Sequence, residues 1–172
     1  MRKIFIILLL YAAGLPASRS HAQGTVPGSP VPDIKKISVL DLEDYISRSD
    51  HPLIVNFWAT FCSPCVKEIP YFQSTVARYR DKKVELLLVS LDLPDYYPRR
   101  IAAFAQKANI IASLAWLNET NADYFCPRID KNWSGGIPAS LFVNNQTHYR
   151  HFFDRQLTDL QVEQEIKLLA AP

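Results

Sequence analysis

The chain has 172 residues, a formal net charge of +2 and three cysteines. Three cysteines are too few for a scaffold held together by disulfides, and their odd number leaves at least one thiol unpaired within the chain. The net charge is small and the sequence has no run of basic residues of the kind that binds nucleic acid, so we expect no nucleic-acid partner.

The N-terminus has the layout of a secretory signal peptide. Arg2 and Lys3 precede an apolar run at 4–13, and small residues surround Ala22, where cleavage is expected. The apolar run is much shorter than the roughly 20 residues of a membrane-spanning helix, which favours cleavage over an uncleaved membrane anchor. Without this segment the net charge becomes about −1. We predict a signal peptide at 1–22 and a periplasmic or secreted protein.

Residues 23–33 are rich in Pro, Gly and Ser and lack apolar periodicity, which predicts a flexible linker. The rest, 34–172, has the size and apolar content of one domain with a single core. Ser38 and Asp41 form a helix-capping pattern ahead of apolar residues at helical spacing, Leu42, Tyr45 and Ile46. We expect a short helix there, followed by a buried strand at 53–58.

A second helix is predicted directly after this strand. At about 100° per residue, five side chains fall within about 80° of one another and form one apolar stripe: Cys65, Ile69, Phe72, Val76 and Tyr79. Lys67 points the opposite way. The helix should therefore pack on a core through the face that carries Cys65.

The middle of the chain predicts two more strands with a helix between them. Residues 84–92 are mostly aliphatic, as in a central strand covered on both faces. Pro98 suits a first helical turn, and apolar residues then recur at helical spacing, at Ile101, Phe104, Ala105 and Ala108. Residues 113–117 predict the next strand. Alternating strands and helices are typical of parallel packing in an α/β fold.

The C-terminal third predicts a hairpin and a last helix. Residues 118–136 are irregular or briefly helical. Two strands then follow, joined by a turn around Asn144 and Asn145, which indicates an antiparallel hairpin. Thr158 with Gln161 caps a final amphipathic helix.

Cys62 and Cys65 form a C-x-x-C pair where a strand meets a helix. The first helical turn has unpaired N–H groups and the positive end of the dipole, which together stabilise a thiolate. Cys62 should therefore attack a substrate disulfide. Cys65 lies on the apolar stripe, so it should be buried and able to attack only a disulfide already formed on Cys62.

Two other interpretations of the pair are a zinc half-site and an inert staple. Zinc would need two further ligands, but the remaining cysteine, Cys126, and the histidines show no spacing typical of a zinc site, so no metal is expected. A staple across so short a loop would stabilise little. Cys126 is interpreted as a buried or unpaired thiol, with a second redox site or an intermolecular site as the alternative.

The segments "NFWATFCSPCVKEIP" (56–70) and "GGIPAS" (135–140) resemble the thioredoxin superfamily, and in particular its exported TlpA/ResA-like branch. The resemblance implies a thioredoxin-like fold, with a central mixed β-sheet flanked by helices on both faces. It also implies a thiol-disulfide oxidoreductase that uses a redox-active disulfide, with a role in cytochrome c maturation or envelope redox homeostasis. We expect protein substrates with disulfides, a membrane electron donor, a monomer and no cofactor.

The resemblance also implies further site residues. A cis-proline that holds the substrate strand would be Pro138, preceded by Ile137. The branch uses a glutamate three residues past the second cysteine, here Glu68, whereas Asn56 stands where thioredoxins carry an aspartate. The helical angles place Glu68 about 20° outside the apolar stripe, so its pKa should be raised and it can accept the proton of the buried thiol. A solvated glutamate is the alternative.

Trp58 and Phe61 are candidates for an apolar, substrate-facing surface beside the sulfurs, with core packing the alternative for Trp58. The spacer between the cysteines brings neither a charge nor a histidine, which predicts a reducing pair, nearer about −270 mV than about −120 mV. A peroxiredoxin-like peroxide reductase is a rival, although Ala59 stands where it would need a threonine. A non-catalytic binding module is another.

Overall fold

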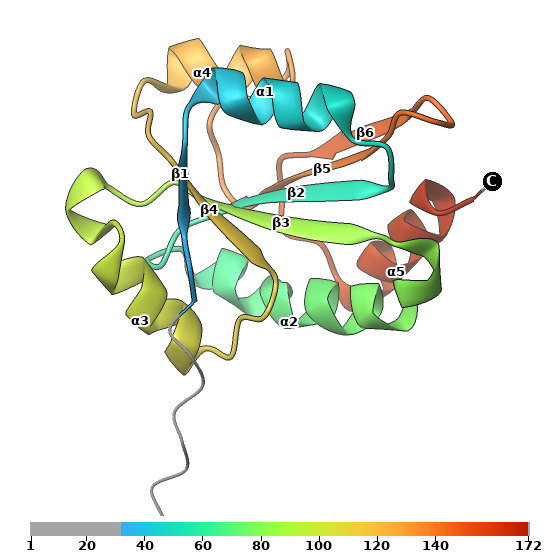
Figure 1. Cartoon of the computed structure of the whole chain (residues 1–172), viewed down its shortest axis with the longest axis horizontal. Coiled ribbons are helices and arrows are strands. Elements are labelled where there is room, and N and C mark those ends of the chain that lie inside the picture. Colours follow the sequence, from blue (N-terminus) through green and yellow to red (C-terminus); the bar gives the residue numbers. More distant parts are fainter. Residues whose placement is uncertain (1–31, 172) are drawn as a thin grey trace, which may run out of the picture.

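The computed structural model describes residues 32–171, which form a six-stranded sheet with helices on both faces (Figure 1). The predicted signal peptide and most of the predicted linker lie outside these residues. The elements are β1 Lys35–Ile37, α1 Val39–Arg48, β2 Leu53–Trp58, α2 Ser63–Arg78, β3 Glu85–Ser90, α3 Arg99–Lys107, β4 Ser113–Leu117, α4 Ala122–Ile129, β5 Ala139–Asn144, β6 Tyr149–Phe153 and α5 Asp159–Leu169, with short 3-10 helices η1 Arg80–Lys82 and η2 Pro94–Tyr96.

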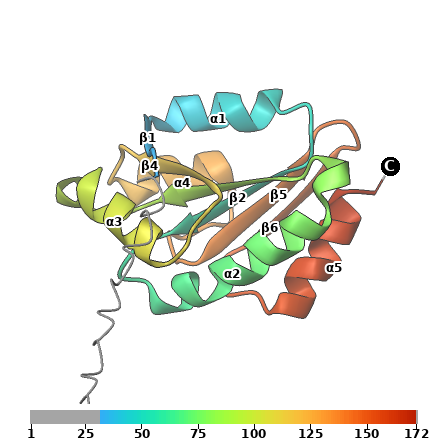
Figure 2. The same ribbon diagram turned by 60° about the horizontal axis from the view of Figure 1, so that its bottom comes forward.

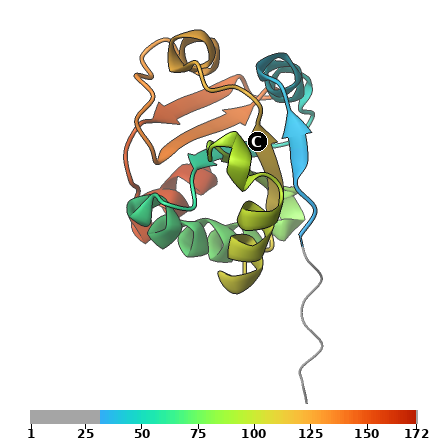
Figure 3. The same ribbon diagram turned by 90° about the vertical axis from the view of Figure 1, so that its left-hand side faces the viewer.

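The sheet is mixed, as expected. Its strand order is β1-β4-β3-β2-β5-β6, and the first four strands in this order are parallel. β5 runs antiparallel to β2, and β6 runs antiparallel to β5. Figure 3 shows β1, in blue, at one edge and the β5–β6 hairpin, in orange, at the other. β2 is thus an inner strand, and the cysteines follow its carboxyl end.

Each face of the sheet has its own core. α1 and α4 cover one face, and α2, α3 and α5 cover the other (Figures 1 and 2). Alternate residues of β2 enter the two cores: Leu53, Val55 and Phe57 pack under α1 and α4, whereas Ile54 and Trp58 pack under α2 and α3. This alternation follows from the two-residue period of a strand. A strand buried on both sides is therefore almost entirely apolar, and Asn56 is the one polar residue of β2.

The predicted helices and strands are present, with small differences. Ser38 and Asp41 form a reciprocal capping box, and so do Thr158 and Gln161. β1 was not predicted, because its three residues at the sheet edge are largely exposed and show no strand pattern. Helix α4 forms within the segment predicted as irregular or briefly helical. No helix among residues 32–171 has the length and apolarity needed to cross a membrane.

Tyr45 departs from the predicted apolar face. Its side chain is 42% exposed, and its hydroxyl donates to both carboxylate oxygens of Glu85, at 2.6 and 2.7 Å. The polar end of a tyrosine seeks such a partner, so the ring lies along the surface of α1 while Leu42 and Ile46 enter the core.

Candidate active site

The cysteines lie at the junction of β2 and α2. Cys62 is the N-cap residue of α2, and its Sγ accepts a hydrogen bond from the Cys65 N–H at 3.3 Å. The two sulfurs form a disulfide. Cys62 keeps 8% of its surface exposed and Cys65 none, so a substrate sulfur can approach Cys62 far more readily. This asymmetry agrees with the roles expected for the attacking and the resolving cysteine.

The stripe predicted for α2 is present. Cys65, Ile69 and Phe72 are buried in the core, and Val76 and Tyr79 pack partly buried against the same cluster. Figure 2 shows α2 and α5 side by side under the sheet. The helix therefore presents its cysteine-bearing face to the sheet, and the residues one turn beyond Cys65 on this face, Glu68 and Ile69, are buried.

Glu68 is one of these residues, and it is fully buried. Its Oε1 accepts from the Asn56 amide at 2.8 Å, and its Oε2 accepts from the Leu157 N–H at 2.8 Å. Burial raises the pKa of Glu68 to about 7, although the hydrogen bonds from Leu157 and Asn56 act in the opposite direction. The alternative of a solvated glutamate is therefore wrong. A carboxyl group with this pKa can take or give a proton near neutral pH.

Asn56 and Ser140 extend the site toward β5. The Asn56 Nδ2 donates to Glu68 and also to the Ser140 Oγ at 2.9 Å, and all three side chains are fully buried. From the sequence, Asn56 stood out only as the residue in place of the thioredoxin aspartate, and Ser140 was missed. The available signal for Ser140 was a lone polar residue inside an apolar strand.

Pro138 precedes β5, and the Ile137–Pro138 peptide bond is cis. The antiparallel pairing of Phe57 with Ala139 brings this bond to the carboxyl end of β2, beside the cysteine turn. Pro138 is buried, and Ile137 is partly exposed. The resemblance to the TlpA/ResA-like branch thus includes the position of Pro138 and the cis form of the bond before it.

Trp58 and Phe61 differ sharply in exposure. Phe61 is 65% exposed, as a substrate-facing side chain would be. Trp58 is fully buried, with its ring centroid 5.8 Å from that of Phe104, and this favours the alternative of core packing. Trp58 fills the interior next to the turn and cannot touch a substrate unless the turn moves.

Cys126 lies apart from the redox pair. It is buried on α4 and belongs to the core cluster on the face opposite α2. Burial, with a smaller contribution from the charge of Asp123, raises the pKa of the Cys126 thiol to about 11. A thiol in this environment is a poor nucleophile. Among the residues described, no three His, Cys, Asp or Glu side chains are grouped so that they could hold a metal ion.

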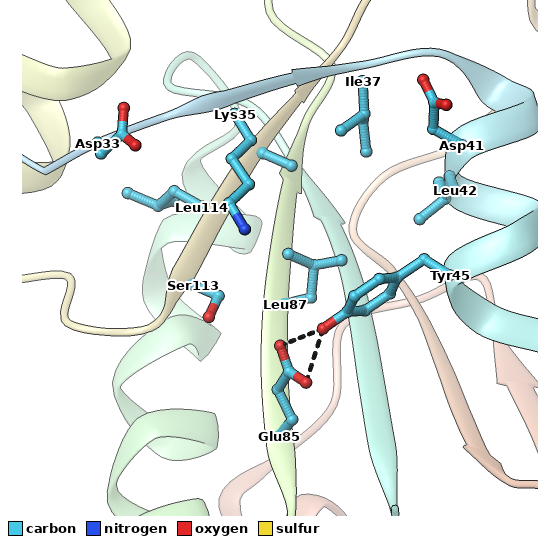
Figure 4. A pocket seen from close by; sticks show the side chains of 11 residues that line it. Asp33, Lys35, Ile37, Asp41, Leu42, Tyr45, Glu85, Leu87, Ser113 and Leu114 are labelled. Carbon is cyan, nitrogen blue, oxygen red and sulfur yellow. Dashed lines mark hydrogen bonds between the residues drawn. The ribbon is translucent and has the colours of Figure 1, made fainter. Parts of the chain in front are cut away.

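A pocket of about 340 Å³ lies at the other end of the sheet (Figure 4). Its walls include the first residues of β1, β3 and β4, whereas the cysteines follow the last residue of β2, which runs parallel to β3. Glu85 in this pocket is already bonded to Tyr45 and, at 2.7 Å, to the His51 Nε2. The pocket therefore takes no part in the chemistry of the disulfide.

Comparison with known proteins agrees with this geometry. The model of the AhpC/TSA family matches residues 27–150. The thiol-disulfide oxidoreductase ResA of Oceanobacillus iheyensis is 41% identical over 96 residues, 51% of this chain and 50% of that protein. ResA of Geobacillus thermodenitrificans is 31% identical over 102 residues, 55% of this chain and 56% of that protein. The chain thus spans about half the length of the curated relatives it matches.

Solved structures show the same fold. A thioredoxin-related protein from Neisseria meningitidis serogroup B superposes with a TM-score of 0.58 at 23% identity, covering 72% of this chain and 87% of that one. A secreted disulfide oxidoreductase of Mycobacterium tuberculosis gives 0.52 at 15% identity, covering 70% and 83%. The expected thioredoxin-like fold and the resemblance to the ResA/TlpA-like branch are confirmed. Because the family model matches most of its residues, the chain belongs to the AhpC/TSA family.

Proposed function

We propose that the chain is a thiol-disulfide oxidoreductase that reduces disulfides in other proteins through Cys62 and Cys65. The observation that carries the proposal is the Cys62–Cys65 disulfide at the amino end of α2, with the buried carboxyl group of Glu68 one helical turn away. The ResA relatives, which are named for this activity, support it.

The reaction has two exchange steps. In the reduced protein, the Cys62 thiolate attacks one sulfur of a substrate disulfide, so that a mixed disulfide forms and the other substrate sulfur leaves as a thiolate. Glu68 then takes the proton of Cys65, and the Cys65 thiolate attacks Cys62. The Cys62–Cys65 disulfide forms, and the second substrate sulfur leaves. The substrate gains two electrons and, with proton uptake, two thiols.

The remaining site residues would hold the substrate. The backbone at Ile137 and Pro138 lies beside the cysteine turn and would pair with the substrate chain around its disulfide. The exposed ring of Phe61 would pack on apolar side chains there. We propose no cofactor for these steps, because all the electrons come from the two thiols.

The proposal also covers where the protein acts in the cell and what reduces it. The signal-like N-terminus supports export to the periplasm or beyond, where a membrane electron donor would have to return the pair to its dithiol form. Cytochrome c maturation or general redox homeostasis of the envelope would supply the substrates, and a monomer suffices for the reaction. Two measurements test this setting: fractionation of cells that express the full chain, and its mass in solution.

Trapping tests the proposed chemistry directly. A Cys65→Ser variant should accumulate mixed disulfides on Cys62 that dithiothreitol releases, and Cys62→Ser should accumulate none. Adducts on Cys126 instead of Cys62 would contradict the assignment. A Cys62→Ser, Cys65→Ser double variant that keeps full activity in cells would favour a non-catalytic binding module. Peroxide consumption far faster than that of a free thiol would favour the peroxide reductase.

A further inference from the structure

Asp92 is a buried carboxylate that the reaction above does not use. It follows β3 at the end of the sheet where the cysteines lie, and it is only 3% exposed. The Thr60 N–H donates to its two oxygens, at 3.2 and 3.0 Å, and the Thr60 hydroxyl donates at 2.6 Å. The Ser90 hydroxyl donates at 2.8 Å, and the Trp116 indole N–H donates to the Asp92 carbonyl at 2.7 Å. Thr60 and Ser90 thus hold the side chain of Asp92, and Trp116 holds its backbone.

These contacts leave a negative charge without a cation. Both carboxylate oxygens of Asp92 act only as acceptors, as in the ionised group. None of the ion pairs formed by residues 32–171 includes Asp92. A buried charge without an ion partner is costly even when it is hydrogen-bonded. This charge lies next to the redox turn, because the Asp92 carboxylate is bonded to Thr60.

The turn connects Asp92 closely to Cys62. Thr60 is two residues before Cys62, so their Cα atoms lie within about 8 Å of each other. The Cys62 N–H bonds the Ala59 carbonyl at 3.0 Å, which fixes the turn between them. The amino end of α2 stabilises a thiolate on Cys62. The charge of Asp92 acts in the opposite direction.

Other charges near the turn differ in kind. Asp95 in η2 and Arg99 and Arg100 in α3 are exposed, so water screens them. Glu68 on α2 is buried, but it remains the same in the comparison that follows. Removing the charge of Asp92 therefore isolates the effect of a buried charge on the Cys62 thiolate.

We propose that Asp92 is a positioning residue of the redox site: it ties the turn 59–62 to β3, and its buried charge disfavours the Cys62 thiolate and makes the Cys62–Cys65 pair more reducing. This inference rests on the proposed function, since it names the device that would hold the pair on the reducing side. A charge about 10 Å away at an effective dielectric constant of about 20 shifts a pKa by about one unit. A tenfold change in thiolate stability corresponds to about 30 mV for this two-electron couple.

The test compares neutral variants at Asp92 with two variants that keep its charge. Asp92→Asn preserves the shape and removes the charge, whereas Thr60→Val and Ser90→Ala each remove one hydroxyl donor to Asp92. The pKa of Cys62 is measured from thiolate absorbance, and the potential from equilibrium with glutathione at a pH above both pKa values. Alkylation followed by peptide mass spectrometry reports Cys62 separately from Cys126. Asp92→Ser is the second neutral variant, for the case that Asp92→Asn does not fold.

We expect the neutral variants to lower the pKa of Cys62 by about one unit and to raise the potential by about 30 mV, with much smaller changes in Thr60→Val and Ser90→Ala. Unchanged values in a folded neutral variant would overturn the proposal, and so would equal shifts in all the variants. The expected shifts in pKa and potential are measured relative to the wild-type protein, so they do not depend on whether that protein reduces or oxidises its substrates. An oxidising wild-type potential would contradict the proposed function alone.

Discussion

Replacing Glu68 with glutamine should change how the stability of the oxidised protein depends on pH. In the disulfide form neither Cys62 nor Cys65 titrates, so the two thiols add nothing to the pH dependence that Glu68 causes. Burial raises its pKa from 4.5 to about 7. Between pH 4.5 and about 7, the folded protein therefore keeps a proton on Glu68 that the unfolded chain has already released. The contribution of Glu68 to stability must therefore fall as the pH rises through this range.

The magnitude follows from the size of the shift. About 2.5 units at 1.36 kcal/mol each amount to about 3 kcal/mol, lost from the free energy of unfolding as the pH rises from about 4.5 to about 7. Glu68→Gln cannot ionise, so it should not show this loss. Above neutral pH the variant should be the more stable protein by about 2 kcal/mol, after about 1 kcal/mol for an imperfect hydrogen bond.

The assay is urea unfolding of the oxidised protein at a series of pH values. Glu119→Gln is the matched control, because Glu119 is a partly exposed glutamate whose Oε1 accepts from two backbone N–H groups. It should follow the wild-type profile. Parallel profiles for wild-type and Glu68→Gln protein would refute the reasoning. In the reduced protein, Glu68→Gln should also slow resolution of the mixed disulfide about 10²-fold near neutral pH, and less at higher pH, where Cys65 ionises unaided.

Three further changes have expected outcomes. Asn56→Ala removes a donor that favours ionised Glu68, so the pKa of Glu68 should rise further and the pH midpoint of the stability loss should move upward. A hydrogen bond to Asp50, and a second to Glu85, raise the pKa of His51. His51→Gln should therefore cost stability below the unfolded-state pKa of about 6.5, and this difference should vanish as the pH rises through the folded-state value. Phe72→Ala, at a fully buried site, should cost about 3–5 kcal/mol in urea unfolding.

Local patterns were sufficient to identify most of the elements and the redox pair. The capping boxes at Ser38 and Thr158 mark the starts of two helices, and the apolar run 53–58 matches the limits of β2. These signals work because they act within a few residues, over which backbone geometry depends on the local sequence. The stripe on α2 likewise predicted that Cys65 would be buried, since packing follows the helical period.

Contacts between distant segments decided the rest. Asn56 and Ser140 are 84 residues apart, and Thr60 and Asp92 are 32 apart, yet each pair is hydrogen-bonded. No local pattern could show that an asparagine would donate to Glu68 or that a loop aspartate would hold the redox turn. The sequence by itself pointed to Cys62, Cys65 and Glu68 as the residues of the proposed chemistry. Only the tertiary structure decided which buried polar groups contact these residues, because burial and strand pairing depend on the whole sheet.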